Sequence, residues 1–138
     1  KKVMISGGEG RTSRSELSEW VDRGAYDIVQ QGADDAGLTE AWHMARMAHH
    51  RGRLCCPHNW QGGLVTVANA HLMAAIPNRF LLESNMTANP LKEGLFKERL
   101  AVKDGYLEVP QGPGLGVELR EGLEEEFPFI NEPWYRME

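Results

Sequence analysis

Four short apolar segments recur along the chain, and each ends at glycine or polar residues that precede a helix-like or loop-like stretch. They cover residues 3–5, 26–30, 54–56 and 80–82. Short apolar runs bounded by turn residues are typical of buried strands. The strand ends recur roughly every 25 residues, which is the length of one strand–helix unit in a parallel sheet or barrel. The pattern therefore predicts an α/β fold with parallel strands.

Apolar residues at helical spacing fill the stretches between these strands. Residues 13–16 have the form of a capping box, which satisfies free amides at a helix start, and Gly24 suits the end of that helix. A second helix is expected over residues 39–50, where the threonine at its start suits an N-cap. A third is expected over residues 63–76, because Pro77 stops it.

The alternation of strands and helices is compatible with a barrel and with an open doubly wound sheet. No glycine-rich dinucleotide motif follows any of the predicted strands, so the open sheet is the less favoured arrangement.

The pattern changes after the fourth strand. Residues 101–110 predict a β-hairpin that turns at Asp104 and Gly105, since Asp-Gly favours tight hairpin turns. A loop rich in glycine and proline follows over residues 111–116. Residues 118–126 are acidic and predict a short helix whose charge is solvated surface rather than a binding tail.

The composition is that of a globular protein with one ordinary domain, since 41% of the 138 residues are apolar and 25% are charged. The chain lacks a run of about 18 apolar residues, so we expect no membrane span. Its net charge is −5 with no basic stripe, so we expect no nucleic-acid partner.

Two further features concern the compartment and the extent of the protein. Cys55 and Cys56 are adjacent, a spacing at which disulfides rarely form, and they predict buried thiols in a reducing compartment, the cytoplasm. The chain opens directly in a strand-like segment, and a parallel strand needs neighbours on both sides. We therefore expect it to be a segment of a longer protein.

Three ionisable residues stand just beyond the ends of three predicted strands: Glu9, His58 and Glu83. In barrels of parallel strands, this rim is where catalytic groups lie. Glu9 follows two glycines and could bind a hard cation such as Mg²⁺, which prefers carboxylate oxygens. His58 follows a proline at a strand end, and an imidazole can serve as a general base near neutral pH. Glu83 follows an apolar strand and, if buried, could keep a proton and donate a hydrogen bond to an oxyanion.

Each of these residues also has a plain structural interpretation: a solvated loop glutamate, a hydrogen-bonded loop histidine and a strand-end glutamate that faces water. The remaining histidines fall on predicted helices and are interpreted as surface or packing residues, namely His43, His49, His50 and His71. Asn59, Trp60 and Asn85 could line a polar substrate site, although Trp60 could equally pack the following helix onto the barrel.

Several short motifs, taken in order, match one enzyme family. They are Gly7-Gly8-Glu9, Asp27-Ile28-Val29-Gln30, Ala36-Gly37-Leu38-Thr39-Glu40, Pro57-His58, Leu82-Glu83, Asp104-Gly105-Tyr106-Leu107-Glu108-Val109-Pro110 and Gly112-Pro113-Gly114-Leu115-Gly116. From about residue 3 to 120, the chain resembles the C-terminal part of the mandelate racemase/muconate-lactonizing branch of the enolase superfamily. The resemblance implies a (β/α)7β TIM-like barrel with a separate capping domain. Residues 1–100 would form the last four strands and the intervening helices, and residues 101–138 a hairpin and tail that pack on the barrel or the capping domain.

The resemblance also implies a role for each candidate residue. Glu9 matches the third carboxylate ligand of the family's Mg²⁺, His58 the general base or acid of strand 7, and Glu83 the strand-8 acid near the enolate. The expected chemistry is removal of the proton α to a carboxylate, and so weak a carbon acid needs a metal and fixed donors to stabilise the developing dianion. The earlier strands, which in the family carry two further metal ligands and a lysine base, are missing here, so the segment is expected to be inactive alone.

The family usually has Gln-Pro-Asp at the end of strand 6, where the aspartate orients the histidine. Here, alignment from Asp27 puts Gly32 at the aspartate position, and alignment back from Thr39 puts Gln31 there. Alternate residues of a strand share a face, so Asp34 could reach the barrel mouth if the strand runs on. Asp34 is therefore the candidate partner of the histidine.

The residues and the resemblance together predict that the complete protein is a Mg²⁺-dependent lyase. It would dehydrate an acid sugar, a small-molecule hydroxy acid, and assemble as a homo-oligomer. A racemase or cycloisomerase of the same family is the second hypothesis, because it shares the proton-abstraction step. Two hypotheses from different classes are a non-catalytic partial barrel kept for binding or assembly, and an unrelated open-sheet binding protein.

Overall fold

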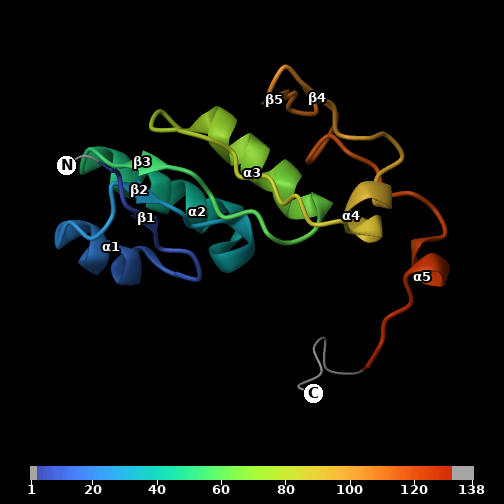
Figure 1. Cartoon of the computed structure of the whole chain (residues 1–138), viewed down its shortest axis with the longest axis horizontal. Coiled ribbons are helices and arrows are strands. Elements are labelled where there is room, and N and C mark those ends of the chain that lie inside the picture. The colour runs from blue at the N-terminus through green and yellow to red at the C-terminus, as the bar shows by residue number, and fades with distance from the viewer. Residues whose placement is uncertain (1–2, 132–138) are drawn as a thin grey trace.

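The computed structural model describes residues 3–131 and shows an α/β arrangement (Figure 1). Three short strands form a parallel sheet in the order β1, β2, β3, and three longer helices alternate with them along the chain. These elements are β1 (Ser6–Gly7), α1 (Arg14–Asp22), β2 (Ile28–Val29), α2 (Ala33–His50), β3 (Leu54–Cys55) and α3 (Gly63–Ala75). The predicted α/β class with parallel strands is confirmed, and Ser6, Ile28 and Leu54 lie side by side in register.

The core lies between the strands and the helices. Val29 and Cys55 belong to a buried cluster with Leu17 of α1, Met44 of α2 and Leu72 of α3. Burial of a large apolar side chain contributes about 1.5–3 kcal/mol to stability. Helix α2 packs against both α1 and α3, so this cluster fixes all three helices relative to the strand ends.

The two outer segments of the sheet differ from the prediction. Residues 80–82, predicted as the fourth strand, form no strand; Arg79 alone makes a parallel bridge, to Cys55. The first strand lies after residues 3–5 rather than on them. Within residues 3–131 neither segment has a partner on its outer side, and an unpaired edge has no ladder to extend it. Exposed apolar side chains on these edges are Val3, Met4, Ile5, Phe80 and Leu81.

The start of α1 contains only half of the predicted capping box. Ser13 is the N-cap, and its Oγ accepts a hydrogen bond from the N–H of Glu16 at 3.3 Å. The Glu16 carboxylate does not return to Ser13; it accepts from Arg11 at 2.5 Å and from the N–H of Thr12 at 3.3 Å. The helix ends just before Gly24, as predicted, and the φ of +71° at Gly24 is one that favours glycine.

Helix α2 begins earlier than the sequence predicts. It starts at Ala33 rather than at Thr39, and its N-cap is Gly32, whose N–H donates to the Asp35 carboxylate at 3.3 Å. The helix kinks at Gly37, where φ is +77°, so Thr39 marks only the start of its second and longer part. The extra helical turn replaces the longer strand that was expected before it.

The C-terminal part of the chain lies beyond α3, against which its first helix packs, and then leads away from the sheet (Figure 1). It contains α4 (Pro90–Gly94), which the sequence does not predict, β4 (Val102–Lys103), β5 (Tyr106–Leu107) and α5 (Leu123–Glu126). Strands β4 and β5 form the predicted antiparallel hairpin, and its turn residues Asp104 and Gly105 have φ values of 51° and 79°. Helix α3 also lies where it is predicted.

Helix α5 covers only the last 4 residues of the acidic stretch predicted as a helix over residues 118–126. The start of that stretch pairs with the chain just after α4. The N–H of Lys97 donates to the carbonyl of Glu118, and the N–H of Arg120 donates to the carbonyl of Leu95, each at 3.0 Å. Because these backbone groups are used in the pairing, they cannot take part in a helix.

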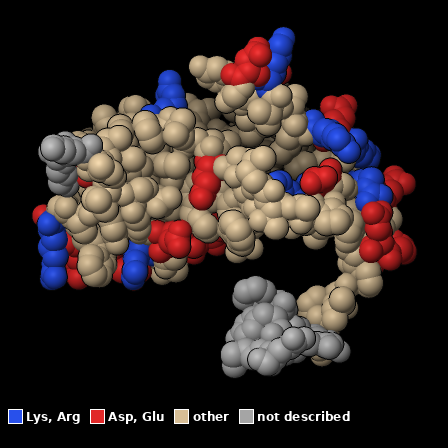
Figure 2. Space-filling view, in the orientation of Figure 1, with Lys and Arg blue, Asp and Glu red and all other residues tan. Residues whose placement is uncertain are grey.

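The surface carries mixed charge. On the face shown in Figure 2, Lys and Arg side chains lie among Asp and Glu side chains rather than in one continuous basic area. Within residues 3–131, no helix is both long and apolar enough to cross a membrane.

Candidate active site

The three ionisable residues predicted at strand ends converge in the structure. Glu9 follows β1, His58 follows β3, and Glu83 follows the segment that bridges to β3. Nδ1 of His58 lies 3.2 Å from Oε2 of Glu83 and 3.4 Å from Oε2 of Glu9. Parallel strands end at one edge of the sheet, which is why residues so far apart in the sequence meet here. We call Glu9, His58 and Glu83 the rim cluster.

The rim cluster is open on one side and closed on the other. The Glu9 side chain is 62% exposed, whereas Glu83 is 36% and His58 22% exposed. The Nδ1 atom of His58 is itself buried, and it makes no hydrogen bond of regular geometry to any residue between 3 and 131. It lies within ion-pair distance of both carboxyl groups, and these contacts are ion pairs only when the imidazole is protonated and the carboxyl group is ionised. The arrangement places a proton-transfer group between two carboxylates.

Asn59 holds Glu83 in the rim cluster. Its backbone N–H donates to Oε2 of Glu83 at 2.9 Å, and its Nδ2 donates to the Glu83 carbonyl at 2.7 Å. Its Oδ1 accepts the hydroxyl of Thr66 on α3 at 3.1 Å. Asn59 is 2% exposed, so it serves as a buried connector and not, as the sequence suggested, as a lining residue of an open site.

Asn69 holds the backbone of His58. This residue of α3 is fully buried; its Nδ2 donates to the His58 carbonyl at 2.8 Å, and its Oδ1 accepts the N–H of Ala33 at 2.9 Å. The N–H of His58 donates to the carbonyl of Gln30 at 3.1 Å. Sequence reasoning missed Asn69, although a lone amide on the apolar face of a predicted helix is a signal that could have found it.

Asp34 lies near the rim cluster for a reason that the sequence did not give. It sits in the first turn of α2, and its carboxylate fills the space where a side chain of residue 32 would stand. Burial raises the pKa of Asp34, the charge of Asp35 raises it further, and the nearby His58 lowers it. No hydrogen bond or ion pair joins Asp34 to His58 within the described part of the chain, so its role as partner of His58 stays a prediction.

Gln31 points away from the rim cluster. It is fully buried, and its Nε2 lies 3.3 Å from Sγ of Cys55 and 3.5 Å from the carbonyl of Ala41. The structure therefore agrees with the alignment that puts Gly32, not Gln31, at the usual aspartate position.

The two cysteines are free thiols in different surroundings. Cys55 is fully buried, and burial raises its pKa to about 12. Cys56 is half-buried, and its pKa is raised by burial and by the charge of Glu83. The prediction of buried thiols is confirmed for Cys55 and only partly for Cys56.

The other polar residues named from the sequence lie outside the rim cluster. Asn85 is buried, and its Nδ2 donates to the carbonyl of Trp60 at 2.7 Å, while the Trp60 side chain is 58% exposed. Among the helical histidines, His71 lies 3.1 Å from the carbonyl of Leu115 through a ring nitrogen. His43 is half-buried and His49 and His50 are exposed, as expected for surface or packing residues.

The rim cluster fits part of a Mg²⁺ site. Glu9 offers an exposed carboxylate, the ligand type that Mg²⁺ prefers. Between residues 3 and 131, however, no three His, Cys, Asp or Glu side chains are arranged to hold a metal ion. Glu9 therefore fits as one ligand of a set whose other members are not found among the described residues.

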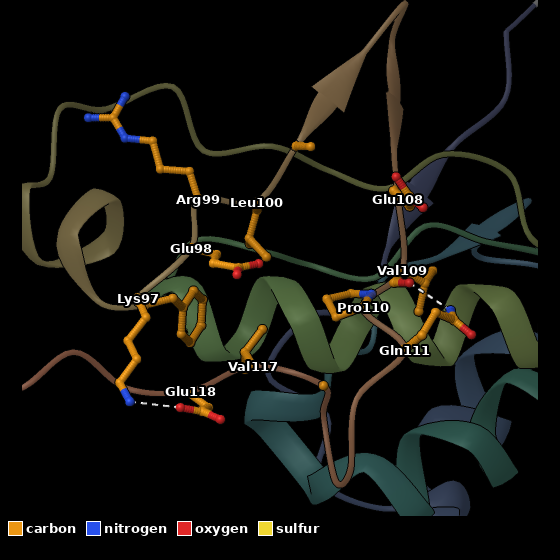
Figure 3. A pocket seen from close by; sticks show the side chains of 13 residues that line it. Lys97, Glu98, Arg99, Leu100, Glu108, Val109, Pro110, Gln111, Val117 and Glu118 are labelled. Atoms are coloured by element: carbon orange, nitrogen blue, oxygen red, sulfur yellow. Dashed lines mark hydrogen bonds and ion pairs between the residues drawn. The ribbon is translucent and has the colours of Figure 1, made fainter.

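Two cavities flank the C-terminal part of the chain. The first has a volume of about 430 Å³ and adjoins the rim cluster, since Glu83, Asn85, Lys92 and Arg99 are among its lining residues. The second has a volume of about 540 Å³ and is lined by residues 96–101, 108–111 and 116–118 (Figure 3). No residue of the rim cluster lines the second cavity, in which Lys97 and Glu118 form an ion pair at 2.7 Å.

Parallel strands that carry ionisable residues at their carboxyl ends are the arrangement found in barrel-type enzymes. Residues 1–123 match the model of the enolase C-terminal domain-like family, and the chain belongs to this family. The resemblance inferred from the motifs is confirmed, and the hypothesis of an unrelated open-sheet binding protein is wrong.

Relatives with established names cover nearly all of this chain. It is 35% identical over 127 residues to the arabinonate dehydratase of Saccharolobus solfataricus, a match that covers 91% of this chain and 34% of that protein. It is 29% identical over 134 residues to the D-galactarolactone cycloisomerase of Agrobacterium fabrum, with coverage of 91% and 35%. Dehydratases of D-galactonate and D-gluconate are also relatives.

The fold agrees with solved structures of the same family. A mandelate racemase/muconate lactonizing enzyme from Sulfitobacter sp. matches with a TM-score of 0.82 and 31% identity, covering 93% of this chain and 32% of that one. The chain thus spans about a third of the length of the proteins it matches.

Proposed function

We propose that this chain forms one side of the active site of a Mg²⁺-dependent enzyme that dehydrates an acid sugar. The observation that carries the proposal is the contact of His58 with both Glu83 and Glu9, at the edge where β1, β3 and the segment that bridges to β3 end. Membership of the enolase C-terminal domain-like family supports it, as do relatives that are acid-sugar dehydratases.

The rim cluster supplies one of the proton-transfer groups that this reaction needs. A base removes the proton α to the carboxylate, the β-hydroxyl takes up a proton and leaves as water, and the resulting enol rearranges to a 2-keto acid. In this proposal His58 acts as the base, or as the acid that assists loss of the hydroxyl; its contact with Glu83 supports such a role. Glu83 would donate a hydrogen bond to the enediolate.

Glu9 would hold one position of the Mg²⁺ ion. When bound, the ion would supply positive charge beside the developing enediolate. The exposure of the Glu9 carboxylate supports this role, because an exposed carboxylate keeps its oxygens available to a metal.

The cavity beside Glu83 supports a small polar substrate. Its volume of about 430 Å³ lies within the usual range for small-molecule sites. Its lining carries both signs of charge, with the cations Lys92 and Arg99 beside Glu83, Glu93 and Glu98.

We propose that the active unit contains more of the barrel than this chain. The chain spans about a third of the length of its relatives, and Glu9 supplies a single carboxylate toward a metal. The 138-residue chain alone is therefore expected to be inactive. A cytoplasmic location is also proposed, because both cysteines are free thiols. Assembly as a homo-oligomer stays a prediction.

We also propose that Asp34 acts on His58 through its charge, since the charge of His58 lowers the pKa of Asp34 without a direct contact between the two groups. In the product of the complete gene, Asp34→Asn is expected to change the pH profile of kcat. An unchanged profile would remove Asp34 from the active site.

A cycloisomerase or racemase is the second candidate, because a D-galactarolactone cycloisomerase is among the relatives and shares the proton-abstraction step. The fate of the intermediate separates the two: a dehydratase releases a 2-keto-3-deoxy acid, whereas a racemase or cycloisomerase returns a proton to the α-carbon.

The deciding experiment incubates the complete gene product with a panel of acid sugars in D₂O, with Mg²⁺ or with EDTA. NMR follows loss of the α-proton, and mass spectrometry follows loss of water. We expect metal-dependent formation of a 2-keto-3-deoxy acid from at least one substrate. α-Deuterium without loss of water would favour the racemase or cycloisomerase. No exchange with any acid sugar would leave a non-catalytic barrel.

A further inference from the structure

The two carboxylate oxygens of Glu83 have different surroundings. Oε2 accepts the backbone N–H of Asn59 at 2.9 Å and lies 3.2 Å from Nδ1 of His58. No hydrogen bond or ion pair reaches Oε1 from the described part of the chain. One oxygen is therefore bound to the protein, and the other is available to a ligand.

Asn59 holds Glu83 at a second point as well. Its Nδ2 donates to the Glu83 carbonyl at 2.7 Å, and its Oδ1 accepts the Thr66 hydroxyl at 3.1 Å. At 2% exposure, the Asn59 amide has exchanged its water contacts for these partners. One side chain thus joins the loop after β3, the segment that carries Glu83, and helix α3.

From this geometry we propose that Asn59 is a positioning residue that fixes the orientation of the Glu83 carboxyl group. The Asn59 N–H needs an acceptor, so it keeps Oε2 against the protein and leaves Oε1 as the oxygen available to a ligand. The proposal rests on the proposed function, in which Glu83 donates to the enediolate; Asn59 itself touches no reacting atom.

The glycine at position 32 makes the contact between Asn59 and Glu83 more important. A Cβ on Gly32 would come within 2.8 Å of the His58 carbonyl, so a side chain at this position requires the loop to shift, and glycine itself offers the imidazole no support. The direct contacts of Nδ1 are with Glu83 and Glu9, and of these two carboxylates Glu83 is the less exposed. By holding Glu83, Asn59 also holds the less exposed of the two carboxylates beside His58.

Four variants of the complete gene product test the role. Asn59→Ala removes the side-chain grip, and Thr66→Val removes the hydroxyl that orients the Asn59 amide, whereas Thr66→Ser keeps it. Asn78→Ala is the matched control: Asn78 is also a buried amide, and it donates to the carbonyls of Ala45 and Arg53, away from the rim cluster.

The measured quantities are kcat and KM for dehydration, normalised to the folded fraction from circular dichroism. We expect Asn59→Ala to lower kcat by about 100-fold and to change KM by less than about threefold, because the lost contacts orient Glu83 for the transition state and do not bind the substrate. Thr66→Val should lower kcat by about tenfold, Thr66→Ser should restore it, and Asn78→Ala should lower stability without changing kcat. The proposal is overturned if Asn59→Ala and Asn78→Ala have the same kcat, or if Thr66→Ser and Thr66→Val do.

A second readout does not depend on activity. Amide hydrogen exchange by NMR follows the backbone N–H of Asn59 in Glu83→Gln, which keeps an acceptor, and in Glu83→Leu, which removes it. We expect protection to persist in the first variant and to fall by at least about tenfold in the second. Unchanged protection of the Asn59 amide in Glu83→Leu overturns the positioning role, whatever the activity of the wild-type enzyme. If the amide responds but no acid sugar exchanges its α-proton, the proposed function fails and the positioning role fails with it.

Discussion

The Asp34 carboxylate occupies the space where a side chain on Gly32 would stand. The two residues share one site: the first turn of α2 folds Asp34 back over a position that has no side chain of its own. A carboxylate is thus present near His58 although position 32 holds glycine.

A methyl group at position 32 should therefore destabilise the protein. Gly32→Ala would bring a Cβ within 2.8 Å of the His58 carbonyl, a backbone atom that cannot easily move. Gly62→Ala is a matched control, because Gly62 is also a helix N-cap with an extended backbone but has no atom within 4 Å of its Cβ position. By urea unfolding, we expect Gly62→Ala to cost less than about 1 kcal/mol. Gly32→Ala should cost about 1–3 kcal/mol more, and equal losses would contradict the shared site.

Asp34→Asn should stabilise the protein at neutral pH. Because burial raises the pKa of Asp34 above its ordinary 3.8, the folded state binds this proton more tightly than the unfolded state. The ionised carboxylate therefore lowers stability as pH rises through 3.8 and the folded pKa, and has no such effect below 3.8. By urea unfolding, we expect Asp34→Asn to raise the free energy of unfolding by less than about 1 kcal/mol at pH 7, because Asp34 remains partly exposed to solvent. At pH 3 we expect no change in the free energy of unfolding.

Asp22→Asn should change the free energy of unfolding in the opposite direction in the same urea assay. The hydrogen bond from Arg51 lowers the pKa of Asp22, so this carboxylate stabilises the fold above pH 3.8 and loses that effect as pH falls through its folded pKa. Asp22→Asn should lower stability at pH 7. If both substitutions changed the free energy of unfolding at pH 7 in the same direction, the opposite effects expected for the two carboxylates would be excluded.

Cys55 should be nearly inert toward thiol reagents. With a pKa of about 12, its thiolate fraction at pH 8 is on the order of 10⁻⁴. Cys56→Ala leaves Cys55 as the single thiol, and Cys55→Ala leaves Cys56. Alkylation by iodoacetamide, followed by mass spectrometry, should be at least about 100-fold slower for Cys55 in the folded protein than in guanidinium. Cys56 should react at an intermediate rate, and rapid labelling of folded Cys55 would contradict its burial.

Glu9→Gln should lower the affinity of the complete gene product for Mg²⁺ without unfolding the protein. Glu9 is largely exposed and contacts only His58 within residues 3–131, so its loss should leave the melting temperature nearly unchanged. Loss of residues that merely support metal ligands costs about 10–100-fold in affinity or activity, so loss of a direct ligand should cost about 100-fold or more. Glu118→Gln, on a remote ion pair with Lys97, is the control. Equal Mg²⁺ titrations for the two variants would exclude Glu9 as a ligand.

The rim cluster could be predicted from the sequence because its geometry follows from strand order. Glu9, His58 and Glu83 each follow an apolar segment, and parallel strands bring such positions to one edge. The hairpin was predictable for a similar reason, since its Asp-Gly turn is a local signal.

Other features depend on tertiary contacts that leave no periodic signal. Asn59 and Asn69 act by hydrogen bonds to backbone carbonyls, and no spacing rule identifies such partners. The strand expected at residues 80–82 needs an outer neighbour that the described residues do not supply. Asp34 reached its predicted vicinity through a helical turn that propensity alone did not indicate, because Gly37 interrupts the pattern there.

The two hydrogen bonds of Asn69 have a consequence for how the protein opens. This one amide ties the carbonyl of His58 and the N–H of Ala33 to helix α3. The loop that carries His58, the start of α2 and the middle of α3 should therefore lose protection together, as a single cooperative unit of local unfolding. A core change in α3 would then alter how often His58 leaves the rim cluster.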